Sequence, residues 1–327
     1  MYLIVTGSAG KLGRAAVAAL RNAGHKVVGL DIQGPLDAAQ SLRADCTDFG
    51  EVMGALSGID ITGRVPDAVV HLAGIPMPGL ATDQRSFEVN TLSTYNVFSA
   101  CARLGISRIV WASSETIFGL PFKEPPASVP LDESHADRPN WSYALSKQLG
   151  ETMAENFCRW APGLSIASLR FSNVYSLEDY GPLPAIQTKP AWRKMNLWAY
   201  VDADDAGEAC RLAVEASFEG HQRLVIAADD TLMEIETSQL LADHFPGMTS
   251  TRPLMGHASL LSSDRAETVL GYRPLQLARS GPRHELSRSC HCVGDFPEAN
   301  PPHKVPHATG QGRGWPHISS DGRRTTM

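Results

Sequence analysis

The sequence of 327 residues has few cysteines and no long apolar run. Its six cysteines are too few and too scattered to form a disulfide framework, which fits a reducing compartment. Nowhere do 18 consecutive apolar residues occur, and no basic segment precedes the apolar start of the chain, so the sequence predicts neither a membrane span nor a secretory signal. We therefore expect a cytoplasmic protein with no membrane partner.

Positive charge is also in short supply. Lys and Arg number 29 against 35 Asp and Glu, for a net charge of −6, so no basic surplus is available to bind a nucleic acid or an anionic membrane. Apolar residues make up 43% and charged residues 20% of the chain, as in ordinary folded proteins, which excludes disordered and fibrous classes. The length allows about two domains, or one large α/β domain with insertions.

Short β-branched runs alternate with longer amphipathic stretches over the first half of the chain. The expected strands are 2–6, 26–31, 68–72, 108–112 and 165–170, and the expected helices between them are 12–23, 48–56, 83–104 and 143–160. Strands that alternate with helices in this way form a parallel sheet with helices on both faces. The sequence therefore predicts a doubly wound α/β fold.

The alternation loosens after residue 170, where we expect a smaller second lobe. The expected features are a proline-rich run at 181–190, the segment 197–201, a helix near 205–216, a strand near 223–227, and helices at 238–245 and 264–270.

The composition changes again in the last part of the chain, 280–327. Leu, Ile, Val and Phe supply only five of these 48 residues, which is too little apolar surface to offset the entropy of ordering, so we expect a disordered tail. The tail contains Cys290, His291 and Cys292, but their spacing fits no tetrahedral zinc pattern, and we predict no metal site.

A glycine-rich turn follows the first expected strand. Gly7, Gly10 and Gly13 let the backbone turn tightly and approach a pyrophosphate, whose charge is met by the amides and the dipole of the next helix. Lys11 and Leu12 lie between the last two glycines and belong to the same expected cofactor contact.

Two carboxylates indicate which cofactor binds this turn. Asp31 ends the second expected strand, where it can bind both hydroxyls of an adenosine ribose. No Arg or Lys follows Asp31 within the next ten residues, so a 2′-phosphate would be repelled without compensation, and NAD is favoured over NADP. Asp45 precedes the helix 48–56, at a place suited to the adenine edge; the alternative is that it caps that helix.

Small residues end the strand expected at 68–72. Leu72, Ala73 and Gly74 would let the backbone pass close to a flat ligand. His71, directly before them, is either a histidine packed at the strand end or a catalytic group, and the packed histidine is the commoner case.

A serine, a tyrosine and a lysine form the most specific set of residues. Ser114 follows the strand 108–112, and Tyr143 and Lys147 share one face of the helix 143–160 because they stand at positions i and i+4. The ammonium can then lower the pKa of the phenol and hold a nicotinamide ribose. The Tyr-Lys spacing is weak by itself, but its order after the glycine-rich turn, the acidic strand end and the serine makes the set specific.

Together these motifs resemble the extended short-chain dehydrogenase/reductase family, and in particular its NAD-dependent epimerase/dehydratase branch. The resemblance covers about residues 1–278 and rests on the glycine-rich turn, Asp31, the runs 71–74 and 114–119, Tyr143 and Lys147. It implies a Rossmann-type NAD-binding domain at 1–172, completed by about 197–228, and a small C-terminal substrate lobe formed by 173–196 and 229–279.

The resemblance also implies roles for single residues. Tyr143 would be the general acid/base, Lys147 would tune it and bind the ribose, and Ser114 would orient the substrate oxygen. Asn90 matches a position used for structural, relay or cofactor contacts, and Asn173 matches a position that contacts the substrate.

The sequence departs from some members of this family. Only Glu115 follows Ser114, where 4,6-dehydratases carry an Asp-Glu pair, so sugar dehydration is disfavoured and Glu115 is expected to contact another substrate. The segment between Asn173 and Tyr200 is shorter than in nucleotide-sugar epimerases, which favours a smaller substrate. Arg193 lies in a run, 192–198, similar to the one by which uronate dehydrogenases bind a sugar carboxylate; the alternative is a surface arginine near a domain junction.

We therefore expect an NAD-dependent oxidoreductase, a dehydrogenase or an epimerase, that acts at a secondary alcohol or hemiacetal carbon of a sugar or sugar acid. A nucleotide-sugar epimerase is one alternative, and a non-catalytic NAD-sensing or scaffold protein is the alternative from another class.

The helices 83–104 and 143–160 carry apolar side chains that favour a homodimer through a four-helix interface; packing on the sheet alone is the other interpretation.

Overall fold

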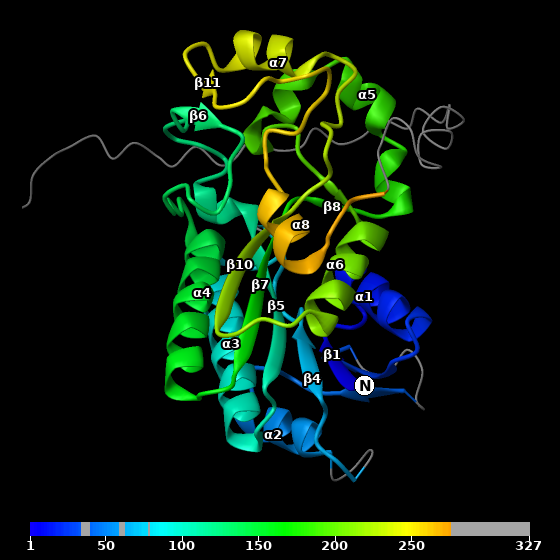
Figure 1. Cartoon of the computed structure of the whole chain (residues 1–327). Coiled ribbons are helices and arrows are strands. Elements are labelled where there is room, and N and C mark those ends of the chain that lie inside the picture. Colours follow the sequence, from blue (N-terminus) through cyan, green and yellow to red (C-terminus); the bar gives the residue numbers. More distant parts are fainter. Residues whose placement is uncertain (34–39, 59–62, 78, 276–327) are drawn as a thin grey trace, which may run out of the picture. The chain divides into compact units, whose positions relative to one another are not determined.

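Seven parallel strands form the central sheet, in the order β10-β7-β5-β4-β1-β2-β3 (Figure 1). They are β1 (Tyr2–Thr6), β2 (Lys26–Asp31), β3 (Ser41–Arg43), β4 (Ala68–His71), β5 (Arg108–Ser114), β7 (Ser165–Phe171) and β10 (His221–Ile226). The computed structural model describes residues 1–33, 40–58, 63–77 and 79–275, so the tail expected at 280–327 lies outside the described residues. The strand order reverses between β1 and β4, and ligands of such sheets bind at the carboxyl ends of the strands near this switch point.

Two layers of helices cover the sheet (Figure 1). Helices α1 (Lys11–Asn22) and α6 (Ala203–Glu215) bury their apolar residues on one face. Helices α2 (Phe49–Ser57), α3 (Asp83–Leu104) and α4 (Ser142–Trp160) bury theirs on the other. Burial on both faces explains why strands such as β1 are apolar throughout instead of alternating. The predicted doubly wound, Rossmann-type α/β fold is confirmed.

Short elements form a smaller lobe beyond the carboxyl ends of the strands. They are β6 (Ser128–Val129) paired with β11 (Thr249–Ser250), β8 (Val174–Tyr175) paired with β9 (Val201–Asp202), helices α5 (Leu183–Gln187) and α7 (Thr237–His244), and the 3-10 turns η1 (Glu115–Phe118), η2 (Leu177–Tyr180), η3 (Pro190–Trp192) and η4 (Lys194–Asn196). The fully buried Trp198 lies in the core of this lobe, together with apolar residues of β6 and α7.

The division of the chain into an NAD-binding domain and a substrate lobe stays a prediction, but helix α8 (Asp264–Leu270) refines it. Ala266, Leu270 and Tyr272 belong to the same buried cluster as α1 and α6. This packing favours assigning α8 to the sheet layer, whereas the sequence placed it in the lobe.

The segment 197–201 contains a left-handed turn. Leu197 and Trp198 both have a positive φ, 57° and 56°, and only Val201–Asp202 pairs as a strand. Two consecutive non-glycine residues in the left-handed region are strained, and such strain clusters near functional sites. The turn brings η4 back toward the sheet.

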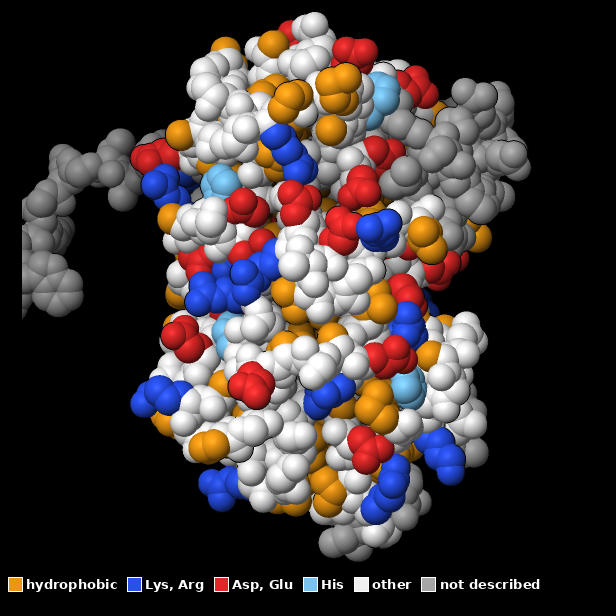
Figure 2. All heavy atoms as spheres, viewed as in Figure 1, with side chains coloured by type: hydrophobic (Ala, Val, Ile, Leu, Met, Phe, Trp, Pro, Cys, Tyr) orange, Lys and Arg blue, Asp and Glu red, His pale blue; other side chains and the backbone are white. Residues whose placement is uncertain are grey.

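Acidic and basic side chains lie interspersed over the face of the molecule shown in Figure 2. None of the helices in the described part of the chain is long and apolar enough to cross a membrane.

Candidate active site

The glycine-rich turn lies between β1 and α1 and packs closely against the segment after β4. Gly7 has a φ of +68°, and a Cβ atom there would lie 2.7 Å from the amide nitrogen of Ala73. A Cβ atom on Gly13 would lie 2.0 Å from the carbonyl oxygen of Gly7. Gly10 is the N-cap of α1, and with no side chain it cannot compete for the first helical amides. This arrangement is suited to a pyrophosphate.

Lys11 and Leu12 begin α1 but point to different partners. The Lys11 ammonium forms an ion pair with Asp179 and donates to the carbonyl oxygen of Val174, 3.2 Å away. Leu12 packs against the apolar core under α1 and α6. Lys11 therefore connects the glycine-rich turn to the start of the lobe.

Asp31 lies at the end of β2, directly beside the glycine-rich turn. Its Oδ2 atom accepts a hydrogen bond from the Ala9 amide at 2.9 Å, and its Oδ1 atom accepts one from the Gln33 amide at 3.0 Å. Arg43 stands opposite Asp31 in the β2–β3 register and donates from Nε to the carbonyl oxygen of Ile32 at 3.1 Å. A cation therefore lies near the expected ribose site, although no cation follows Asp31 closely in the sequence.

Asp45 forms a turn of its own. Its Oδ1 atom accepts hydrogen bonds from the amide and the hydroxyl of Thr47, at 2.8 and 2.7 Å. The N-cap of α2 is Asp48, which accepts from the Glu51 amide at 3.0 Å. The alternative interpretation, that Asp45 caps this helix, is wrong because Asp48 occupies the capping position.

The segment after β4 is fixed by hydrogen bonds from two sides. The amides of Leu72 and Ala73 each donate to the Thr6 hydroxyl oxygen at 3.2 Å. Asn90 in α3 accepts from the Ile75 amide at 2.7 Å and donates back to its carbonyl oxygen at 3.1 Å. Gly74 lies between these two anchors, and a Cβ atom there would come within 2.8 Å of the Asn90 Oδ1 atom.

His71 is a packed histidine at the end of β4. It is fully buried, its Nδ1 atom lies 2.7 Å from the Thr6 hydroxyl, and burial lowers its pKa to about 3, with a smaller contribution from the nearby Lys147 charge. The neutral, buried ring fits a packed histidine at the strand end, which is the commoner of the two roles considered.

Ser114, Tyr143 and Lys147 come together at the carboxyl end of β5. Ser114 is the last residue of β5, and its hydroxyl acts to lower the pKa of the nearby Tyr143 phenol. The Lys147 ammonium lies 5.6 Å from the centroid of the Tyr143 ring and 5.1 Å from that of Trp111, and it donates to the carbonyl oxygen of Ala112 at 2.7 Å. The predicted spacing on one helix face is therefore present in the structure.

Burial shifts both titrating groups of this set. Burial raises the pKa of Tyr143 to about 12, the Ser114 hydroxyl lowers it, and the charge of Glu115 raises it. Burial lowers the pKa of Lys147 to about 8. Shifts of this kind mark the pair as a candidate catalytic site.

Helix α4 approaches β5 closely enough to place Tyr143 and Lys147 because position 150 is a glycine. A Cβ atom on Gly150 would lie 2.2 Å from the Trp111 ring. One turn away from Lys147, Glu151 accepts two hydrogen bonds from Arg170 of β7, at 2.9 and 2.7 Å, and one from Ser113 at 2.6 Å. These buried contacts fix α4 against two strands of the sheet.

Glu115 lies next to this set and is held by two other segments. Ser172, which follows β7, donates to its Oε2 atom at 2.6 Å, and Asn196 of η4 donates to its Oε1 atom at 3.5 Å. All three residues are buried. Burial raises the pKa of the Glu115 carboxyl to about 7, against the opposing effects of Ser172, the Arg193 charge and Asn196.

The comparisons with known proteins agree with this geometry. Residues 3–227, more than half of the chain, match the NAD dependent epimerase/dehydratase family. The chain belongs to this family. The expected membership, the enzyme class and the NAD cofactor of the family are confirmed.

Relatives in the family act on free and on nucleotide-linked sugars. The chain is 28% identical over 244 residues to an L-arabinose 1-dehydrogenase (NAD(P)(+)) of Haloferax volcanii, covering 71% of this chain and 91% of the relative. It is 27% identical over 282 residues to a UDP-glucose 4-epimerase of Neisseria meningitidis serogroup C, covering 82% of this chain and 79% of the relative.

Solved structures share the fold. The UDP-glucose 4-epimerase of Thermus thermophilus, in complex with NAD, aligns with a TM-score of 0.64 and 24% identity, over 90% of this chain and 100% of that one. A mutated uronate dehydrogenase aligns with a TM-score of 0.62 and 21% identity, over 90% of this chain and 88% of that one.

Arg193 in this family member is not a free surface arginine. With the Asn173 amide oriented to present its oxygen, the two terminal guanidinium nitrogens of Arg193 lie 3.1 and 3.0 Å from that oxygen. One of them also donates to the carbonyl oxygen of Ala199 at 3.3 Å, and the guanidinium lies over the Tyr175 ring, 5.5 Å from its centroid. Both terminal nitrogens of Arg193 therefore have hydrogen-bond partners, and its charge lowers the pKa of Glu115.

Several residues of the site carry no recognisable sequence signal. Glu151 and Arg170 lie in an ordinary helix and strand, and Ser172 and Asn196 become neighbours of Glu115 only through the fold. A buried charged residue inside an apolar strand, such as Arg170 in β7, is the one signal that could have drawn attention.

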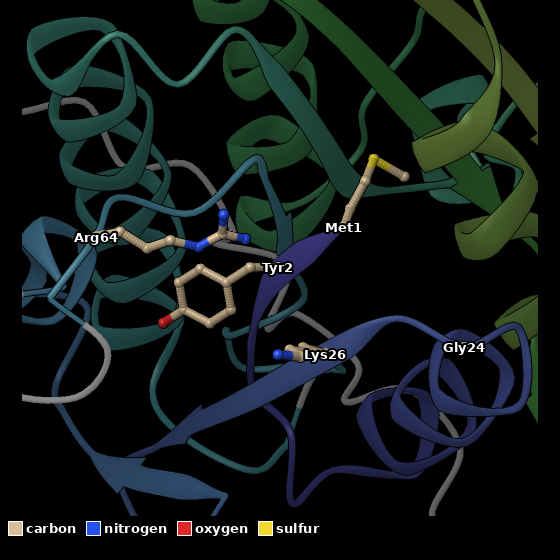
Figure 3. A pocket seen from close by; sticks show the side chains of 5 residues that line it. All are labelled: Met1, Tyr2, Gly24, Lys26 and Arg64. Carbon is tan, nitrogen blue, oxygen red and sulfur yellow. The ribbon is translucent and has the colours of Figure 1, made fainter.

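Two cavities lie away from this site. One, of about 480 Å³, is lined by Met1, Tyr2, Gly24, Lys26 and Arg64 at the amino ends of β1 and β2, and Figure 3 shows the Arg64 guanidinium over the Tyr2 ring. The other, of about 590 Å³, is lined by residues from the start of β10, the start of α8 and the segment 132–134. Within the described ranges, no group of His, Cys, Asp and Glu could hold a metal ion.

Proposed function

We propose that the protein is an NAD-dependent dehydrogenase that oxidises the hemiacetal carbon of a free sugar. The observation that carries this proposal is the position of Tyr143, whose phenol lies beside Ser114 at the carboxyl end of β5 and whose ring centroid lies 5.6 Å from the Lys147 ammonium. Such a group can take the proton of a substrate hydroxyl.

The roles of the three residues follow from their positions. Tyr143 accepts the proton of the reacting hydroxyl at its phenol oxygen, while Ser114 holds the same substrate oxygen by a hydrogen bond. Lys147 favours the ionised phenol through its positive charge. When NAD is bound, it supplies the acceptor for the hydride that leaves the same carbon, so that a carbonyl group forms.

The binding of NAD is assigned to the elements around the glycine-rich turn. Gly7, Gly10 and Gly13 leave room for the pyrophosphate, and Asp31 receives the adenosine ribose. Lys11, Leu12, Asp45, Leu72, Ala73, Gly74 and Asn90 complete the proposed binding residues, of which Lys11, Asp45 and Asn90 act by holding the surrounding backbone.

A free sugar is favoured over a nucleotide sugar because the segment between Asn173 and Tyr200 folds back on itself. Tyr180, Leu183 and Tyr200 form a small buried cluster, and Gln187 donates to the carbonyl oxygen of Leu232 at 2.7 Å. The L-arabinose 1-dehydrogenase relative, of which the chain covers 91%, supports the same substrate class.

A screen of NAD reduction tests the proposal. The purified protein is mixed with NAD and with aldoses, uronates or nucleotide sugars, and the absorbance of reduced nicotinamide is followed. We expect reduction with at least one free sugar. Net NAD reduction with nucleotide sugars alone would instead identify a nucleotide-sugar dehydrogenase. An epimerase returns the hydride to the sugar and gives no net reduction, so each sugar is also analysed for an inverted stereocentre. NAD binding with neither change in any class would favour the scaffold alternative.

We further propose that the protein works as a cytoplasmic homodimer. Exposed apolar side chains on α3 and α4 support the dimer, namely Leu92, Tyr95, Leu145 and Trp160. The four cysteines in the described part of the chain are free thiols, which supports a reducing compartment.

A further inference from the structure

The Glu115 carboxylate has one firmly bound oxygen and one weakly bound oxygen. Its Oε2 atom accepts from Ser172 at 2.6 Å, whereas Asn196 reaches its Oε1 atom only at 3.5 Å, the outer limit of a hydrogen bond. The Oε1 atom therefore keeps the capacity to accept a stronger hydrogen bond. Because Glu115 directly follows Ser114 at the end of β5, its carboxylate lies beside the proposed reacting group.

The orientation of the Asn196 amide is set by its neighbours. Its Nδ2 atom faces two acceptors, the Ala199 carbonyl oxygen at 2.8 Å and the Glu115 carboxylate. Its Oδ1 atom must then face the other way, and within the described residues it is buried with no hydrogen-bond partner. Asn196 is 5% exposed, so water does not readily satisfy this oxygen. A ligand hydroxyl would supply the missing donor.

In the described part of the chain, Arg193 has one buried nitrogen without a hydrogen-bond partner. Its two terminal nitrogens are engaged by Asn173 and Ala199, while its Nε atom is buried and unpartnered among the residues that the structure describes. A carboxylate usually binds arginine through two parallel hydrogen bonds. Here both terminal nitrogens already hold Asn173, so Nε is the nitrogen without a partner within the described ranges and can donate to the oxygen of a hydroxyl group.

We propose that Glu115 is a specificity-determining residue that binds a hydroxyl of a neutral sugar through Oε1 and excludes sugars that carry a carboxylate. Asn196 Oδ1 and Arg193 Nε complete this subsite as one acceptor and one donor. The inference rests on the proposed function, because the same Tyr143 must act on the sugar held here. It replaces one of the two roles considered for Arg193 from the sequence, the binding of a uronate carboxylate.

The exclusion of acidic sugars should depend on pH. The titratable and charged groups that face Glu115 are Tyr143 from α4 and Arg193 from the segment between η3 and η4. The pKa of Glu115 is raised to about 7, so the carboxyl is neutral below this pH and negative above it. The preference for neutral sugars should therefore grow as the pH rises through 7, since a uronate is negative throughout this range.

The test compares Glu115→Gln with the wild type and with Glu124→Gln, which neutralises an exposed carboxylate a few residues further on. For each protein, kcat/KM is measured with galactose and galacturonate and with glucose and glucuronate. The sugar-dependent rise in melting temperature in the presence of NADH is measured for the same four sugars. We expect the wild type and the control to prefer the neutral sugars, and Glu115→Gln to shift the ratio toward uronates by roughly 10- to 100-fold.

A second variant separates the effect of the negative charge from the effect of the side-chain length. Glu115→Asp keeps the negative charge but shortens the side chain, so it should lower kcat/KM for the neutral sugars while still excluding the uronates. This variant also decides the matter if Glu115→Gln fails to fold.

Three results would overturn the inference: a wild-type preference for uronates, an unchanged ratio in folded Glu115→Gln that binds NADH normally, or equal losses of both sugars in Glu115→Asp. The proposed function fails in a different way, because the wild type would then reduce no NAD with any free sugar. The melting-temperature shifts still reveal whether neutral sugars are preferred, and no shift with any sugar would overturn both proposals.

Discussion

At the scale of single residues, we expect Tyr143 to determine turnover most directly. Tyr143→Phe removes only the hydroxyl, so the ring contacts and Lys147 should stay in place and NAD should bind with nearly unchanged affinity. We expect kcat to fall by roughly 10²- to 10⁴-fold, the usual contribution of a general acid/base. Ser114→Ala should cost less because the proton acceptor remains, and Lys147→Met should weaken both binding and turnover. Stopped-flow kinetics and NAD titrations separate these outcomes.

The same residue predicts the direction of the pH dependence. Burial raises the pKa of Tyr143 to about 12 before the cofactor binds, and the oxidation needs the ionised phenol. The rate of sugar oxidation should therefore rise between pH of about 6 and about 9. A rate that falls over this range, at saturating NAD and sugar, would exclude Tyr143 as the proton acceptor.

We expect Asp31 and Arg43 together to decide the choice of cofactor. The Asp31 carboxylate repels a 2′-phosphate, while Arg43 lies opposite it in the sheet register and could neutralise one. Asp31→Ala should therefore improve the kcat/KM for NADP by roughly tenfold or more, and the added change Arg43→Ala should remove most of that gain. If the double variant keeps the improved NADP activity, Arg43 does not contact the phosphate.

At the scale of secondary-structure elements, the position of α4 depends on a buried ion pair. Glu151 is held by the fully buried Arg170, which also contacts Asp137 at 2.9 Å. Glu151→Ala leaves the guanidinium without its main partner and should lower the free energy of unfolding by about 3–5 kcal/mol. The matched control is Glu155→Ala, which changes an exposed residue one turn further along the same helix. This variant should change the free energy of unfolding by less than about 0.5 kcal/mol. Denaturant unfolding measures both, and equal effects would contradict the role given to Glu151.

Elements with a strong local signal could be predicted from the sequence. The helices 83–104 and 264–270 and the strands 2–6 and 26–31 have the predicted bounds, because apolar periodicity and flanking glycines mark them. The strand β3 was missed because it has three residues and none is fully buried. The residues around Glu115 were missed for another reason: Ser172 and Asn196 reach it only after β7 pairs with β5 and after the left-handed turn at Leu197. Local sequence patterns do not reveal residues that become neighbours only in the folded chain.

At the scale of the whole molecule, the proposed homodimer rests on apolar surface that the single chain leaves exposed. On α3, Leu92 and Tyr95 are 40% and 46% exposed, and on α4, Leu145 and Trp160 are 40% and 60% exposed. The two helices pack against each other, as shown by the Tyr95 and Phe157 rings, whose centroids are 5.7 Å apart. A two-fold axis would bring the same helix pair of a second copy onto this surface and bury these side chains.

Light scattering at micromolar concentration should therefore give twice the chain mass of 35.3 kDa. Leu92→Glu places a charge in the proposed interface and should shift the protein toward the monomer, because burying an unpaired carboxylate opposes association. The control Met255→Glu changes an apolar residue that is 77% exposed in the lobe, and it should leave the mass unchanged. A monomeric wild type, or a dimer that is equally stable in Leu92→Glu, would mean that α3 and α4 serve only to cover the sheet.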